Sequence, residues 1–157
     1  MAEESTLDQL ERSLAHILRL LGDRATTSDV ASRCGYDLPA ASWALLEYLE
    51  ALGALRVSDI AACHGVDVSS ITPRLKRLEQ AGLVARERLP ADARAFLINI
   101  TPEGIRALDS VHAARREILR PALNDIEAAR LAEAADVLAR ITGHLSKEPR
   151  GRLGGGD

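Results

Sequence analysis

Residues 69–84 read Ser-Ser-Ile-Thr-Pro-Arg-Leu-Lys-Arg-Leu-Glu-Gln-Ala-Gly-Leu-Val, and this stretch decides how the rest of the chain is interpreted. Ile71, Leu75 and Leu78 recur at every third or fourth position, which is the spacing of one face of an α-helix. Gly82 follows where a left-handed C-terminal cap is expected. The stretch therefore predicts a helix that carries its basic residues on the polar side.

The neighbouring segments add a turn, a second helix and a hairpin. Before the stretch, Ser58 can cap a short helix that stops at Gly65, and either Asp67 or Ser69 can cap the helix that follows. After it, the hydropathy pattern of residues 84–89 and 95–100 has a period of two. These segments therefore predict two strands around a polar tip. Helix, turn, helix and charged hairpin in this order can place a helix in a DNA groove and an arginine beside it.

The remaining segments are mostly helical in pattern. Apolar residues at helical spacing predict helices over 7–21, around 28–33 and from the Asp37–Pro39 region to Gly53, and residues 55–57 form a possible short strand. Thr101-Pro102-Glu103 is a strong helix start. Pro121 is expected to bend or interrupt that helix, and Asn124 or Asp125 to cap the last one.

The composition limits the class of protein. The 157 residues are 46% hydrophobic and 27% charged, as in an ordinary globular domain, and no apolar run approaches the roughly 20 residues that span a bilayer. The acidic start matches neither a secretory signal nor a transit peptide, and two cysteines make no disulfide framework. We therefore expect a cytoplasmic protein without membrane association.

The net charge of −3 conceals a local excess of positive charge. Residues 68–94 contain six cations and three anions, a balance of +3, whereas residues 1–11 contain four acids and no Lys or Arg. Because the local sign of charge governs docking to phosphates, the basic segment matters more than the total.

In this order and spacing, several segments resemble the multiple-antibiotic-resistance regulator (MarR) family of winged helix-turn-helix transcription factors. They are residues 38–46, 57–61, 69–84, 92–95 and 100–104. The resemblance covers roughly residues 7–145 and implies a mostly α (α+β) fold, a winged helix-turn-helix with N- and C-terminal dimerisation helices. It also implies a homodimer on double-stranded DNA, with one recognition helix per subunit in the major groove and one wing tip in the minor groove.

The expected domain organisation follows from this resemblance. It comprises an N-terminal dimerisation helix and linker (1–37), a DNA-binding lobe (38–101), C-terminal dimerisation helices (102–147) and a disordered tail (148–157).

Two departures from the family pattern affect the expected function. Many family members carry a polar or basic residue where Pro73 stands, so we expect a contact to be missing and the helix to be stiffened there. The form Thr-Pro-x-Leu-Lys-x-Leu-Glu at residues 72–79 is similar to the organic-hydroperoxide-sensing branch, whose reactive Cys lies in the first helix. Residues 7–21 contain no Cys, so peroxide sensing by that route is not expected.

The DNA-binding candidates are hydroxyls that can bond phosphates or base edges, and arginines that can bind phosphates, guanine or the minor groove. They are Ser69, Ser70, Thr72, Arg74, Arg77, Arg86, Arg88 and Arg94. The serines can alternatively cap the helix, Arg77 can pair near Glu79, and Arg94 can be an exposed hairpin residue without a partner. Asp92 is expected to shape the wing by pairing with a nearby Arg, or simply to form the turn.

Other reactive side chains favour structural roles. Cys34 and Cys63 are expected to be small buried hydrophobes more than redox sensors. The four histidines (His16, His64, His112 and His144) show no short metal spacing, so no metal or cofactor is expected. His16, Tyr36 and Trp43 are candidates for a pocket that binds a small-molecule effector, with packing in the core as the alternative for Trp43.

The sequence leaves three classes of function, in decreasing order of expectation. The first is a ligand-responsive transcriptional regulator, usually a repressor in this family, which binds a near-palindromic operator as a homodimer. The second is a winged-helix protein-interaction module that does not bind DNA, which the acidic total charge favours slightly. An enzyme is least expected, because the sequence has no Gly-rich phosphate loop and no arrangement of paired carboxylates or Ser/His/Asp.

Overall fold

The computed structural model describes residues 2–89 and 92–147, and the side chains of residues 4–88 and 96–145. The tail at 148–157, which we expected to be disordered, lies outside the described residues. The chain divides into two compact units, Met1–Ile118 and Leu119–Asp157, with the boundary inside helix α6. The expected mostly α fold with a small winged sheet is confirmed.

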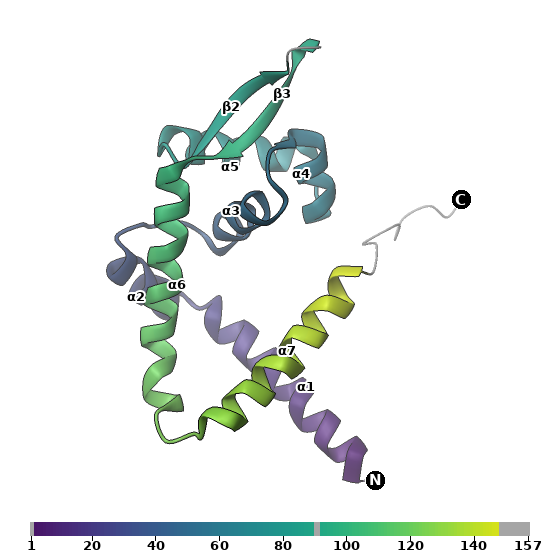
Figure 1. The fold of residues 1–157 in the computed structure, drawn as a ribbon, viewed down its shortest axis with the longest axis vertical. Helices are drawn as coiled ribbons and strands as arrows, with labels where there is room; N and C mark the ends of the chain where they lie inside the picture. Colours follow the sequence, from purple (N-terminus) through teal and green to yellow (C-terminus); the bar gives the residue numbers. More distant parts are fainter. Residues whose placement is uncertain (1, 90–91, 148–157) are drawn as a thin grey trace, which may run out of the picture. The chain divides into compact units, whose positions relative to one another are not determined.

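Three helices precede the predicted DNA-binding segment (Figure 1). They are α1 (Ala2–Leu21), α2 (Arg24–Cys34) and α3 (Ala40–Leu52). Helix α2 is longer than the short helix expected around 28–33, because Asp23 caps it: Oδ2 of Asp23 accepts a hydrogen bond from the Ala25 N–H at 3.1 Å. The next helix does begin just after Pro39 and end at Gly53, as predicted.

The helix-turn-helix consists of α4 (Val57–His64) and α5 (Val68–Gln80), which follow the short strand β1 (Leu55–Arg56). Gly65 ends α4 in the left-handed conformation, with φ of 62°, and the Val66 N–H then donates to the Ala61 carbonyl at 3.0 Å. Ser58 was expected to cap α4 but lies within it, one residue after its start. Asp67 occupies the cap position of α5, where its carbonyl, not its side chain, accepts from the first turn.

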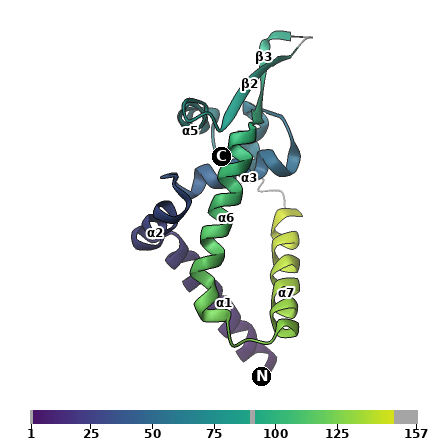
Figure 2. The same cartoon turned by 60° about the vertical axis from the view of Figure 1, so that its left-hand side comes forward.

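A three-stranded antiparallel sheet completes the lobe. The hairpin strands are β2 (Val84–Leu89) and β3 (Asp92–Ile100), and the strand order is β1-β3-β2. Ile98 pairs with Leu55 on one side and Arg86 on the other. Both views show the hairpin extending beyond α3, α4 and α5 (Figure 1 and Figure 2), so it is placed as a wing beside the helix-turn-helix.

The core of the first unit is formed by one apolar face from each helix of the lobe and from the first half of α6 (Pro102–Leu123). Its largest fully buried side chains are Leu45, Leu46, Leu49, Ile60, Ile71, Leu75, Leu78, Leu83, Ile98, Leu108 and Val111. Each such side chain stabilises the fold by about 1.5–3 kcal/mol relative to exposure. This burial holds α5 with Ile71, Leu75 and Leu78 inward and therefore determines which residues face outward.

The start of α6 is hydrogen-bonded to the turn between α5 and β2. The hydroxyl of Thr101 donates to the Gly82 carbonyl at 2.6 Å and accepts from the Gly104 N–H at 3.0 Å. The backbone N–H of Thr101 also donates to the Leu83 carbonyl at 3.0 Å. The predicted helix start at Thr101-Pro102-Glu103 is confirmed, and its capping residue additionally ties the base of the wing to α6.

The second unit contains the end of α6 and helix α7 (Ala128–Lys147). Pro121 does not interrupt α6 early, since the helix continues to Leu123 and Pro121 lies in its last turn. Helix α7 begins at Ala128, later than the predicted cap at Asn124 or Asp125 would place its start. The Glu127 carbonyl accepts a hydrogen bond from the Leu131 N–H at this end.

Candidate nucleic-acid interface

The outward face of α5 carries a stripe of exposed side chains opposite the core. Ile71, Leu75 and Leu78 are each at most 1% exposed, so their side is fully covered. The positions that point away at helical spacing are all exposed, namely Ser69, Pro73, Lys76 and Gln80. This stripe, which we call the outward face, is the part of α5 that can enter a groove.

The hydroxyls at the start of α5 differ in how they are engaged. Ser69 and Ser70 are exposed within the first turn, and their side chains make no hydrogen bond to another residue in the described part of the chain. The Thr72 hydroxyl instead donates to the Val68 carbonyl at 2.7 Å. The serines therefore do not cap the helix. The Thr72 hydroxyl already donates its hydrogen to a backbone carbonyl.

Two of the three cations of α5 are exposed to solvent. Lys76 and Arg77 are exposed and Arg74 is half-buried, and none of them forms an ion pair with a residue that the structure describes. Glu79 was the alternative partner for Arg77, but it pairs with Arg86. Because exposed, unpaired cations release counterions when they meet phosphates, this arrangement suits binding to a nucleic-acid backbone.

The two arginines of β2 lie on one face of the hairpin and both have intramolecular contacts. Arg86 Nε is 3.1 Å from Glu79 Oε2, which joins β2 to α5. The Arg88 guanidinium carbon lies 5.7 Å from the centre of the Phe96 ring. A cation over an aromatic face is held in place but keeps its charge, so Arg88 stays able to meet a phosphate.

The wing tip carries the two remaining sequence candidates. The side chains of Asp92 and Arg94 lie outside the described residues, so their roles stay predictions. The backbone of both residues belongs to β3, and the register shifts between Arg88 and Leu89 on the facing strand.

The sequence interpretation did not include Lys76 and Gln80, although both lie on the outward face. Both could have been found from the sequence, because with Ser69 and Pro73 they lie at helical spacing on the side opposite the apolar stripe of Ile71, Leu75 and Leu78. The local charge balance included Lys76 but did not assign it a contact.

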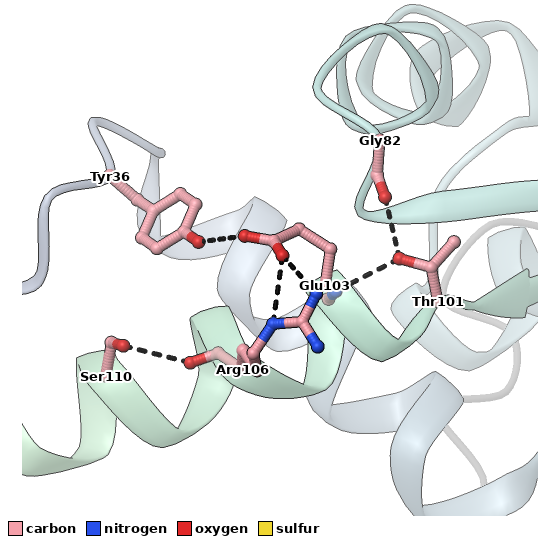
Figure 3. A network of polar contacts seen from close by, with 7 residues as sticks. Tyr36, Gly82, Thr101, Glu103, Arg106 and Ser110 are labelled. Atoms are coloured by element: carbon pink, nitrogen blue, oxygen red, sulfur yellow. Dashed lines mark hydrogen bonds and ion pairs between the residues drawn. The ribbon is translucent and has the colours of Figure 1, made fainter.

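The proposed effector residues are only partly brought together. The rings of Tyr36 and Trp43 meet edge to face with centroids 6.2 Å apart, and Trp43 is buried in the core. His16 is exposed on α1, and no contact found among the described side chains joins it to that pair. The Tyr36 hydroxyl donates to Glu103 Oε1 at 2.5 Å, and Glu103 also pairs with Arg106 (Figure 3).

This network shifts the pKa values of its acids in opposite directions. The hydrogen bond from Tyr36, and then the guanidinium of Arg106, lower the pKa of Glu103 below its usual value. The same hydrogen bond raises the pKa of Tyr36. The ionised Glu103 thus links the segment before α3 to the first turn of α6, close to the base of the wing.

Replacing Glu103 by glutamine is expected to reduce stability in a pH-dependent way. Since folding lowers the pKa of Glu103, its contribution is present above the glutamate pKa of the unfolded chain, about 4.3, and is lost as the pH falls through the lower folded value. The difference in unfolding free energy between the wild type and Glu103→Gln should therefore be present at pH 7 and shrink towards pH 3. Urea unfolding at fixed protein concentration measures it.

Glu50→Gln is the matched control for Glu103→Gln, because Glu50 is exposed on α3 and has no ion pair within the described residues. A difference for Glu103→Gln that stays constant from pH 7 to pH 3 would contradict the proposed role of its charge.

The cysteines and histidines show no grouped site in the part of the chain that is described. Cys34 is buried with its Sγ 3.4 Å from the Tyr36 carbonyl, and Cys63 is half-buried on α4. No cluster of three or more His, Cys, Asp or Glu side chains among the described residues could hold a metal ion. No helix within residues 2–89 and 92–147 is long and apolar enough to cross a membrane.

Comparison with known proteins connects this geometry to one family. Residues 38–96 match the MarR family model. The chain is 28% identical over 134 residues to MdtR of Bacillus subtilis, described as an HTH-type transcriptional repressor, covering 85% of this chain and 86% of MdtR. It is 28% identical over 102 residues to YdgJ of B. subtilis, an uncharacterized HTH-type transcriptional regulator. That match covers 65% of this chain and 62% of YdgJ, less than two thirds of its length.

A solved structure shares the fold. The structure of a MarR family protein from Bacillus stearothermophilus matches with a TM-score of 0.74 at 22% identity, covering 92% of this chain and 98% of the other. The matched segment 38–96 contains α3, the helix-turn-helix and most of the hairpin, which are the elements that carry the outward face and the wing. Over residues 38–96, the chain is therefore similar to the MarR family of winged helix-turn-helix regulators.

Proposed function

We propose that this protein is a sequence-specific regulator of transcription that binds double-stranded DNA as a homodimer, most simply as a repressor. The observation that carries the proposal is the pair of cations on α5, Lys76 on the outward face and Arg77 beside it. Both are exposed and unpaired within the described structure, next to a projecting hairpin. Among the family relatives, MdtR is described as a transcriptional repressor. A helix with such a face and an adjacent wing suits the major groove and its flanking minor groove.

The homodimer is supported by apolar side chains that a single copy leaves exposed. On α1, Leu7 is 65% and Leu18 71% exposed. On α7, Val137 is 45% and Leu145 60% exposed. A helix with a long apolar stripe normally buries it, and a second copy of the chain would cover these stripes. Two-fold symmetry then predicts half-sites about one helical turn apart, and sedimentation measures the oligomeric state.

The regulatory ligand is proposed to be a small molecule near Tyr36 and Trp43, with His16 as a further candidate. The support is the edge-to-face contact of the two rings and the link from Tyr36 to the start of α6. Trp43 is the sole tryptophan of the sequence, so its fluorescence would report a ligand that enters beside it.

The proposal is tested by a gel shift with DNA from upstream of the protein's own gene and with sites selected from random duplexes. We expect a shift that depends on sequence and weakens steeply with salt, because counterions are released on binding. The variant Arg94→Ala should bind more weakly, by roughly thirtyfold or more, while its unfolding midpoint is unchanged, since a minor-groove arginine contributes on the order of 1–3 kcal/mol and a homodimer loses two of them.

Two results would contradict parts of this proposal. Absence of any sequence-selective shift, together with capture of a stable protein partner, would favour the interaction-module alternative. Equal affinity of Arg94→Ala and the wild type would remove Arg94 from the interface but leave the α5 contacts in place.

A further inference from the structure

Pro73 lies at the centre of the outward face of α5. It is two residues from both Ile71 and Leu75, and at 3.6 residues per turn a step of two residues rotates the side chain by about 200°. Because those two neighbours are at most 1% exposed, Pro73 points almost directly away from the core. Its ring is exposed between Ser69 and Lys76 on the same stripe.

A proline at this position is locally unfavourable for the helix. Pro73 is inside α5, beyond the first turn where proline is tolerated, and it cannot donate to the Ser69 carbonyl one turn earlier. An interior proline costs about 3 kcal/mol relative to alanine in an exposed helix. The exposed ring gains no core burial that would offset this cost, and a contact outside the subunit would supply a benefit.

The pyrrolidine ring of Pro73 is an apolar group among polar neighbours. On the same stripe of α5 it lies between Ser69 and Lys76, and all three residues are exposed. In the major groove, the 5-methyl group of thymine is the apolar feature of the base edges.

We propose that Pro73 is a specificity-determining residue that contacts a thymine 5-methyl group in each half-site. This inference rests on the proposed DNA-binding function, and it changes the expectation that Pro73 merely removes a contact. The ring does not donate or accept a hydrogen bond, so it favours a base pair that presents a methyl group over one that presents only polar atoms.

The experiment compares thymine with uracil, which differs only by the absence of the 5-methyl group. Sites selected with the wild-type protein are resynthesised with single thymines replaced by uracil, and binding is measured at low salt so that phosphate contacts keep weak complexes measurable. We expect one thymine per half-site at which uracil weakens wild-type binding by roughly fourfold, the value of one buried methyl group. In Pro73→Ala this effect should fall to less than twofold at the same position.

Pro73→Ala is expected to fold, because alanine restores the missing hydrogen bond and is the best helix former. Circular dichroism and urea unfolding check this directly. Lys76→Ala is the matched variant on the same face: it should weaken binding to thymine and uracil DNA by the same factor.

The outcomes separate this inference from the proposed function. The role of Pro73 would be overturned if wild-type protein bound its site but no uracil replacement weakened the binding. It would also be overturned if uracil weakened the binding of Pro73→Ala as much as that of the wild type. Wild-type protein that binds no DNA would overturn the proposed function and this inference with it.

Discussion

Replacing Gly104 by alanine is expected to destabilise the protein by about 3 kcal/mol or more, near the upper end of what overpacking costs in a core. Gly104 is buried in the first turn of α6, and a Cβ atom there would overlap the Leu83 carbonyl oxygen and lie 2.7 Å from Ile100 Cγ1. The Leu83 carbonyl cannot move freely, because it accepts the Thr101 N–H at 3.0 Å. Urea unfolding measures the decrease in stability.

The same substitution at Gly143 is the control for Gly104→Ala. Gly143 lies inside α7, where a Cβ would meet no atom within 4 Å, so alanine should stabilise the second unit by about 0.5–1 kcal/mol through helix propensity. Unchanged stability of Gly104→Ala would mean that α6 can move away from the α5–β2 turn at little cost. The hydrogen bonds of Thr101 would then not hold the base of the wing rigidly against α6.

Removing the two exposed cations of α5, which form no ion pair within the described residues, is expected to have the largest effect on DNA binding. The double variant Lys76→Ala/Arg77→Ala should bind at least on the order of a thousandfold more weakly, since each cation contributes roughly 1 kcal/mol or more and a homodimer loses four such contacts. The slope of log affinity against log salt should fall by about 0.9 for each phosphate that the variant no longer neutralises. Gel shifts over a salt series measure both quantities.

A variant with the same change in charge shows whether position matters. Arg24→Ala/Arg33→Ala also removes two positive charges but changes α2, where Arg33 pairs with Asp29 at 2.9 Å. Its affinity and salt slope should stay within about twofold of the wild type, because distant exposed charges are largely screened. Equal decreases in the two double variants would show that total charge, not the face of α5, controls binding.

The parts of the fold that depend on neighbours in the chain could be predicted from the sequence. The buried face of α5 follows from Ile71, Leu75 and Leu78, whose spacing determines which side packs inward whatever the rest of the protein does. The strand Val84–Leu89 and the helix start after Thr101 are also confirmed. The errors lie at the ends of elements. Helix α2 began earlier and α7 later than their patterns suggested, because several residues near a helix end can supply the first acceptor. The second hairpin strand, predicted over 95–100, begins at Asp92.

The pairing of charges in the candidate site could not be predicted in this way. Arg77 and Glu79 are close in sequence, but they are two positions apart on a helix and do not face each other. After α5 the chain turns and continues as β2, and this places Arg86 of β2 beside Glu79 of α5. Arg77 is thereby left without a carboxylate partner among the described residues, which makes it available for a phosphate.

The sequence by itself determined the order of helices and strands, the inward face of α5 and the local excess of positive charge. Each of these depends on residues within one or two helical turns, where spacing sets direction. Only the tertiary structure decided that Tyr36 bonds Glu103, that Gly104 packs on the Leu83 carbonyl and that Glu79 neutralises Arg86. Those contacts join different secondary-structure elements, and their partners are selected by how the buried faces pack, which the local pattern does not contain.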